Sequence, residues 1–300
     1  MLWTLATLAS VTLAQQTDTT VAVEQGMRLR VENFGGEVVI RAGTNNQVRV
    51  RADHTSRDFV EIERRAGTLS VQAENRRGPP QSVRFNISVP KWMAVSVNGV
   101  YTDADIRGTE ADVTVETVQG EVNLEGGGGF VSLQSVEGVV TLRGTKGRIE
   151  ANSVNEGVEA YNVVGDLRVE TVNGDVVLSG IDAASVEAIT VNGDIEYDGT
   201  LKDNGRYSFA THNGDVTVSV PEKANLTVGV STYQGEFESS FEVKLQGISA
   251  KKRFTFQLGN GSGRLEIESF QGDIQLRRPG ERDGGSKAKS KDHDRDKEQQ

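Results

Sequence analysis

The sequence is poor in the residue types on which many active sites and covalent cross-links depend. Its 300 residues include no cysteine, three histidines, two tryptophans and five prolines. The lack of cysteine excludes disulfides, zinc–thiolate sites, thiol nucleophiles and a lipidated cysteine anchor. Because 34 glycines accompany so few prolines, the composition favours many tight turns between strands over a disordered Pro-Gly tract.

Basic residues are also scarce relative to acidic ones, 33 against 43, which gives a net charge of −10 at pH 7. Nucleic acid and anionic membrane surfaces are bound by basic faces, so we exclude both as the main partner. We interpret the charge as a solubility feature. Attraction of cations or basic partners is the alternative.

Long apolar runs are absent after residue 14. Residues 1–14, MLWTLATLASVTLA, are uncharged and too short to span a bilayer comfortably. They resemble the apolar part of a secretory signal peptide with cleavage after Ala14, although no Lys or Arg precedes them. A buried N-terminal strand is the alternative. The sequence therefore predicts a secreted or periplasmic/cell-envelope protein with no stable transmembrane anchor.

What the chain does contain is a repeated phrase of Val, Asn or Gln, Gly, Asp or Glu, and Val or Ile. Clear copies start at Val172, Val191 and Phe270, and between residues 99 and 235 the copies are about 18 to 21 residues apart. Such a period indicates a solenoid, and segments that alternate apolar with polar residues, as in 167–171, indicate strands. We predict an all-β fold, a single-stranded parallel β-helix or solenoid with rungs of about 18–21 residues and two related half-turns.

The glycines and acidic residues of the phrase are expected at turns between strands. Gly and Asn tolerate positive φ, and Asp accepts hydrogen bonds from turn amides. The predicted turn residues are Gly99, Gly120, Gly138, Gly174, Asp175, Gly193, Asp194, Gly214, Asp215, Gly235, Gly272 and Asp273. Since calcium favours oxygen ligands, a calcium-stabilised scaffold is a second interpretation, although the Gly-Gly-x-Gly-x-Asp calcium repeat is missing.

Two columns of the repeat are expected to stack as ladders inside the solenoid. The column two places before the aligned glycine contains Phe34, Val97, Val118, Val136, Val154, Val172, Val191, His212, Tyr233 and Phe270. The column two places after it contains Val38, Tyr101, Val122, Val140, Val158, Val176, Ile195, Val216, Phe237 and Ile274. A further ladder of stacked amides is expected from Asn98, Asn155, Asn173, Asn192 and Asn213.

Composition divides the chain into four parts. Residues 1–14 form the signal peptide, residues 17–95 irregular coils that cap the solenoid, residues 96–278 the regular solenoid, and residues 279–300 a disordered tail whose charges cancel. A cap is expected because a bare terminal rung exposes strand edges to other chains.

The sequence offers no convincing catalytic, cofactor-binding or metal-binding set. His212 stands in an apolar column, while His54 and His293 cannot be assembled into a triad or a metal cluster. The Gly126–Gly129 run lacks the Lys-Ser/Thr of a phosphate loop. Paired carboxylates could cleave glycosides, but nothing singles out a pair among 43 acids. We therefore predict a protein without enzymatic activity and without a cofactor.

The V-x-G-D-[VI]-x-[VL] phrase resembles the repeat of a bacterial family of adhesin-like proteins of unknown function, over roughly residues 30–276. The resemblance implies a β-solenoid at the cell envelope and supplies no catalytic residues. We predict an exported, non-enzymatic, adhesin-like surface-presenting or structural protein of the envelope. Its expected partner is an unknown envelope component, a glycan or a protein. A polysaccharide-binding or polysaccharide-cleaving β-helix protein is the alternative.

Overall fold

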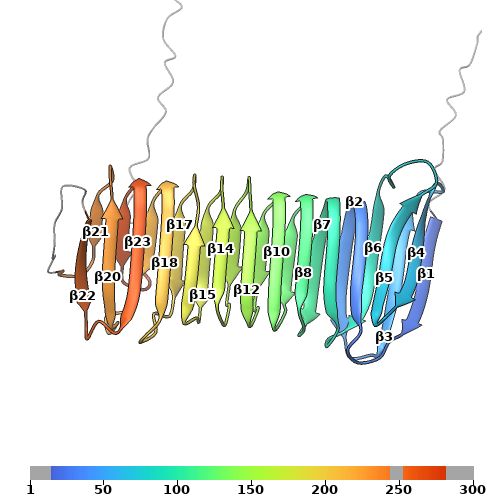
Figure 1. The fold of residues 1–300 in the computed structure, drawn as a ribbon, viewed down its shortest axis with the longest axis horizontal. Coiled ribbons are helices and arrows are strands. Elements are labelled where there is room, and N and C mark those ends of the chain that lie inside the picture. Colours follow the sequence, from blue (N-terminus) through green and yellow to red (C-terminus); the bar gives the residue numbers. More distant parts are fainter. Residues whose placement is uncertain (1–14, 244–252, 282–300) are drawn as a thin grey trace, which may run out of the picture.

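The computed structural model describes residues 15–243 and 253–281, and within them it contains 24 strands and no helix. The strands stand side by side in an elongated rack with two layers (Figure 1). The all-β solenoid predicted from the repeat is therefore confirmed. The predicted signal peptide at 1–14 lies outside the described residues, as do residues 282–300 of the predicted tail.

Each regular rung contributes one strand to either layer. One layer contains β8 (Val113–Gln119), β10 (Phe130–Glu137), β12 (Arg148–Ser153), β14 (Leu167–Thr171), β16 (Ser185–Ile189) and β18 (Arg206–Asn213). The other contains β9 (Val122–Gly126), β11 (Val140–Arg143), β13 (Val158–Tyr161), β15 (Val176–Ile181), β17 (Ile195–Gly199) and β19 (Val216–Ser219). Strands pair in parallel with their equivalents one rung away, so that Val131 lies opposite Ile149 and Ile149 opposite Leu167.

The N-terminal end is built on two long strands, β2 (Arg28–Gly43) and β7 (Ala94–Thr109), which pair in parallel with each other. β5 (Thr68–Asn75) and β6 (Val83–Pro90) pair in parallel with the other side of β2. Three antiparallel strands complete this end: β3 (Gln47–His54) on β6, β1 (Gln15–Ala22) on β3, and β4 (Asp58–Arg65) on β5. Antiparallel strands interrupt the parallel register that a further chain would need to continue the rack.

The C-terminal end does not follow the order of the sequence. β23 (Gly263–Gln271) pairs with β18 on one side and with β20 (Leu226–Thr232) on the other. Likewise β24 (Ile274–Arg277) lies between β19 and β21 (Phe237–Ser239), and β22 (Arg253–Leu258) pairs antiparallel with β20. The last rung of the chain, β23 and β24, therefore lies between the rung of β18 and β19 and the rung of β20 and β21, although it follows both in sequence.

The column two places after the aligned glycine lies in the core, as expected, from Val122 to Val216. The exceptions are Tyr101, which is 54 % exposed, and Phe237, which is half-buried. Tyr101 is exposed because Gly99 is not at a turn. Gly99 lies inside β7 opposite Asn33. The corner that contacts Gly120 of the next rung is formed by Thr102 instead.

The column two places before the glycine was predicted to be interior, and this prediction holds for Val97, which is buried, but is wrong for the regular rungs. Five valines of the regular rungs, Val118, Val136, Val154, Val172 and Val191, are 39–46 % exposed. The reason is strand parity, because alternate side chains point to opposite faces.

In one rung, Leu167, Val169 and Thr171 point inward, so the next residue, Val172, must point outward. The chain then bends at the corner, after which Val176 points inward again. The prediction followed the apolar character of these valines and ignored the alternation that continues through the preceding strand.

Glycine is required at the corners because successive backbones are in direct contact there. A Cβ built on Gly193 would overlap the carbonyl oxygen of Gly174, and one on Gly214 would overlap the carbonyl oxygen of Gly193. The obstacle is backbone held in the sheet on both sides, which cannot move aside as a flexible side chain could.

We predict that Gly193→Ala lowers the free energy of unfolding by about 2–3 kcal/mol, because the added methyl group forces two rungs apart. Urea denaturation followed by circular dichroism measures the change. Gly43→Ala is the matched control: no atom lies within 4 Å of a Cβ built on Gly43, which sits at the end of β2. A wild-type midpoint for Gly193→Ala would contradict the proposed corner contact.

Candidate functional site: an exposed apolar ladder

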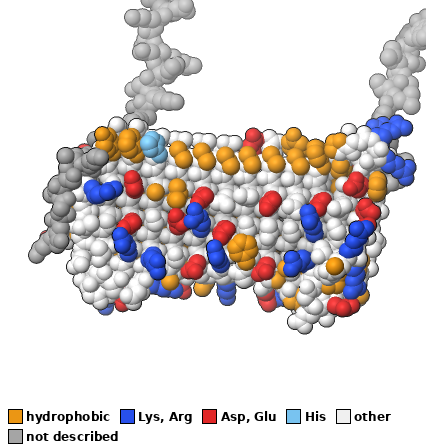
Figure 2. Space-filling view, in the orientation of Figure 1, with side chains coloured by type: hydrophobic (Ala, Val, Ile, Leu, Met, Phe, Trp, Pro, Cys, Tyr) orange, Lys and Arg blue, Asp and Glu red, His pale blue; other side chains and the backbone are white. Residues whose placement is uncertain are grey.

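This column forms a continuous surface feature, in which Val100 takes the place of the buried Val97 opposite Val118. We call it the outer ladder: ten residues, one from each rung, stacked in register along one edge of the rack. In spatial order they are Phe34, Val100, Val118, Val136, Val154, Val172, Val191, His212, Phe270 and Tyr233. Figure 2 shows the row as a nearly straight line of apolar side chains along one edge of the body.

Rings occupy both ends of the outer ladder. At the C-terminal end the rings of His212 and Phe270 stack at 4.6 Å and those of Phe270 and Tyr233 at 4.8 Å, with interplanar angles of 9° and 6°. At the other end Phe34 packs edge-on against Tyr101 at 5.5 Å. Single exposed apolar side chains are ordinary on proteins, but a contiguous apolar row marks an interaction site.

A row of amides runs beside the outer ladder. Nδ2 of Asn173 donates to Oδ1 of Asn155 at 3.2 Å, Asn192 donates to Asn173 at 2.8 Å, and Asn213 donates to Asn192 at 2.7 Å. Asn98, which was expected in this row, lies instead in β7 opposite Glu116. The amide row stabilises the parallel register at the corner.

On the inner side of the outer ladder lies a buried hydroxyl row that the sequence analysis missed. Each hydroxyl donates to the backbone carbonyl of the corner one rung below, as from Thr190 to Gly174 at 3.0 Å and from Thr211 to Gly193 at 2.9 Å. The members are Thr117, Ser135, Ser153, Thr171, Thr190, Thr211 and Ser269. The available signal was a Ser or Thr three places before the corner glycine in most rungs.

Acidic residues of the corners hold the next rung through its backbone. Oδ1 of Asp175 accepts the amide of Asp194 at 2.8 Å, and Oδ1 of Asp194 accepts the amide of Asp215 at 2.7 Å. Asp215 and Asp273 continue the row, accepting the amides of Asp273 and Glu236. Partial desolvation, with repulsion from the neighbouring carboxylates, raises the pKa of Asp194 despite its hydrogen bond from the Asp215 amide.

Metal-binding geometry is a separate question from this turn chemistry. Within residues 15–243 and 253–281, no three His, Cys, Asp or Glu side chains are grouped so as to hold a metal ion. At the corners the acidic row accepts backbone amides of the next rung, and glycines such as Gly193 pack against the backbone of the neighbouring rung.

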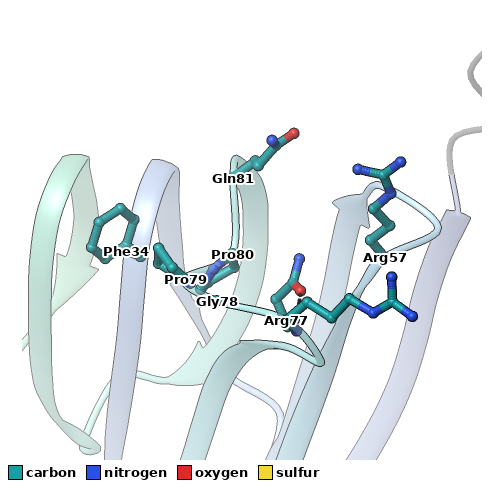
Figure 3. Close-up of a pocket in the computed structure, with 8 residues that line it drawn as sticks. Phe34, Arg57, Arg77, Gly78, Pro79, Pro80 and Gln81 are labelled. Carbon is teal, nitrogen blue, oxygen red and sulfur yellow. Dashed lines mark hydrogen bonds between the residues drawn. The ribbon is translucent and has the colours of Figure 1, made fainter.

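A cavity of about 550 Å³ lies at the N-terminal end of the outer ladder. Figure 3 shows Phe34 and Pro79 on one side of it and Arg57 and Arg77 on the other. The cavity thus combines an aromatic wall with two guanidinium groups, which suits an anionic group attached to an apolar one. Apart from Phe34 of β2 and Asn75 of β5, its lining residues belong to loops outside the repeat, so the sequence period gave no sign of it.

Buried Asp58 fixes the loops around this cavity. Its carboxylate accepts hydrogen bonds from the Thr55 hydroxyl at 2.5 Å, from Nδ2 of Asn75 at 2.7 Å and from the Gln81 backbone. Burial raises the pKa of Asp58, but the hydrogen bonds outweigh burial and hold the pKa below its ordinary value.

The fold and the outer ladder define a class: a two-layer parallel β-solenoid that presents one regular apolar edge. Residues 27–277 match the Toastrack DUF4097 family, and the chain belongs to this family. No curated protein matches the sequence. None of the segments described in the structure forms a helix long and apolar enough to cross a membrane.

Solved structures with a similar arrangement are distant in sequence. A putative adhesin from Parabacteroides merdae is 8 % identical with a TM-score of 0.47, covering 87 % of this chain and 96 % of its own. A putative lipid binding protein from Parabacteroides distasonis is 9 % identical with a TM-score of 0.45, with the same coverage. A putative cell adhesion protein from Clostridium sporogenes is 12 % identical with a TM-score of 0.25, covering 88 % and 100 %. These similarities are too weak to bear on function.

The corrected position of the valines predicts opposite outcomes for two neighbouring substitutions. Val172→Thr changes an exposed side chain and is expected to alter the free energy of unfolding by less than about 0.5 kcal/mol. Val176→Thr buries a hydroxyl in the core, where Val176 is fully buried, and is expected to cost about 1–3 kcal/mol. Chemical denaturation of both variants measures the difference, and equal losses would place Val172 inside.

Asp58 predicts a pH dependence of stability. Its folded-state pKa lies below the unfolded value of about 3.9, so its stabilisation is complete above that value and is lost as the pH falls through the folded-state pKa. We expect Asp58→Asn to lower the free energy of unfolding by about 1.5–3 kcal/mol at pH 7. The difference in free energy of unfolding between variant and wild type should shrink as the pH falls below about 4. Denaturation at pH 7 and pH 3 tests this, with exposed Asp198→Asn as the control. A gap independent of pH would contradict it.

Proposed function

We propose that this protein is an exported, non-enzymatic, adhesin-like protein that presents its surface at the cell envelope. The observation that carries the proposal is the outer ladder: the rack keeps ten side chains in one line, eight of them exposed and two, Phe34 and Val100, half-buried. A domain gains nothing in its own stability from apolar side chains left in water, so this line is best explained by a partner that covers it.

The surroundings of the outer ladder support binding of an uncharged surface. Of the residues that directly precede or follow a ladder residue in the chain, only Glu137 is charged. Its carboxylate accepts a hydrogen bond from Nε2 of Gln119 in the neighbouring rung. Depletion of charge at the centre is typical of protein interfaces, whereas a net charge of −10 opposes binding to an anionic surface.

A polysaccharide-binding or polysaccharide-cleaving protein is the rival proposal. It requires a groove with a carboxylate pair and exposed aromatic side chains. A hollow on the strand face, of about 380 Å³, lies over β18, β20, β22 and β23 and includes Glu266 and Glu268. Its aromatic lining residues, Phe209 and Phe254, are buried, so their rings are not available to stack on a sugar. This favours the adhesin-like proposal.

Binding of the purified protein to isolated envelope material and to a glycan array tests the proposal. Wild type is expected to bind, and replacing Val136 and Val191 together by Arg is expected to weaken binding at least tenfold, about 1.4 kcal/mol. Thr141→Arg with Thr217→Arg adds the same charge on the β11–β19 layer and serves as the matched control. Uniform absence of binding, or equal binding by all three proteins, would contradict the proposal. Release of shortened glycans would support the rival.

A further inference from the structure

The size of the outer ladder suits a protein partner of the same length. Ten residues stacked at about 4.8 Å per rung give a row about 43 Å long. The strip from the outer ladder to the acidic row is four residues wide, about 13 Å across at about 3.3 Å per residue. The product, about 570 Å², is close to the roughly 600 Å² per partner at the lower end of stable complexes.

The spacing of the outer ladder restricts which partner surface can pack against it with one side chain opposite each ladder residue. A matching surface must also offer apolar groups at about 4.8 Å intervals along a straight line, which is the spacing between strands of a sheet. An α-helix returns a residue to the same face every about 5.4 Å and so falls out of step within a few turns. The rack itself has the required spacing, length and straightness (Figure 2).

The outer ladder can pair with a reversed copy of itself. It reads aromatic, six valines, then three rings, so an antiparallel copy places valine against valine over the four central rungs and ring against ring at the extremes. Between these, Val100 would face Phe270 and Val118 would face His212 of the partner copy, which packs an aliphatic side chain against a ring. Phe34 would face Tyr233 of the partner copy, and Val136 would face Val191 of the partner copy. A closed two-fold pair uses one self-complementary patch on both chains and leaves no unpaired half.

Charge does not oppose this pairing. The corner carboxylates that lie nearest, such as Asp175 and Asp194, are turned along the rack to accept the amides of the next rung. The amide row stands between them and the valines, and its asparagines retain a second Nδ2 hydrogen that could bond across the contact.

We propose that the outer ladder is a homodimer interface, in which a second copy packs antiparallel with the two-fold axis between Val154 and Val172. This inference rests on the proposed function and deepens it: two copies joined through the outer ladder present their remaining surfaces to the envelope together, so that a ladder variant weakens envelope binding through loss of bivalency. A lipid surface, an extended peptide and a glycan are the other occupants that the experiment distinguishes.

Because the sequence contains no cysteine, any disulfide that forms must join the cysteines introduced by substitution. Val136→Cys and Val191→Cys are prepared separately, mixed and oxidised. A disulfide needs Cα atoms within about 7 Å. In the proposed pair Val136 lies opposite Val191, whereas the two copies of Val136 are three rungs, about 14 Å, apart. We expect covalent dimer from the mixture and none from either variant alone.

Light scattering with analytical ultracentrifugation gives the second readout. Val154→Arg with Val172→Arg is expected to raise the dimer dissociation constant at least about 100-fold, because four unpaired guanidinium groups would meet at the axis. The Thr141→Arg, Thr217→Arg protein should dimerise as wild type does, and circular dichroism checks that both variants fold.

Three results would overturn the inference. A wild-type monomer at all accessible concentrations excludes the dimer, and if that monomer binds envelope material through the outer ladder, the proposed function stands without it. Disulfide dimers of Val136→Cys alone would show a parallel pair. A dimer that survives Val154→Arg with Val172→Arg would place the interface elsewhere. Binding of wild-type monomer to neutral lipid vesicles would assign the ladder to lipid.

Discussion

Direct contact between the backbones of successive rungs at the corners is the constraint on which the rest of the structure depends. The carbonyl of one corner occupies the space that a Cβ of the next would need, as between Gly174 and Gly193. This contact fixes the register of the parallel strands on both layers. The hydroxyl row and the acidic row then bind the backbone groups that the bend would leave unpaired.

A fixed register has a consequence for every other position of the rung. A residue at one position of a rung lies next to the residues at the equivalent position of the two neighbouring rungs. The same side-chain contact is therefore repeated along the rack. Polar side chains such as Asn173 and Asn192 can pair with their equivalents. Exposed apolar ones, such as Val154 and Val172, instead merge into one row. Eight such exposed residues on an ordinary domain would be scattered, whereas here they form one continuous surface.

Much of the fold could be predicted from the sequence because period and alternation are local signals. The rungs, the strand at residues 167–171 and the core position of Val176 follow from them. The inward-pointing Thr171 and outward-pointing Val172 were also predictable, had alternation been given more weight than hydrophobicity.

The insertion of β23 between β18 and β20 could not be predicted, since similar rungs fit either neighbour equally well. The cavity beside Phe34 depends on loops without a period, so no repeat marks it.

The ends of the rack explain why association along its side is the contact left to the molecule. Long parallel stacks invite further chains at their terminal rungs. Here three of the four terminal parallel strands are covered by antiparallel ones, β3 on β6 and β4 on β5 at one end and β22 on β20 at the other, while β21 pairs in parallel with β24. Growth at the covered strands would require a change of strand direction, whereas the outer ladder runs along the side of the rack and consists of valines and rings. The chain thus covers most of the edges that would lead to filaments, and the finite length of the outer ladder suits a single partner.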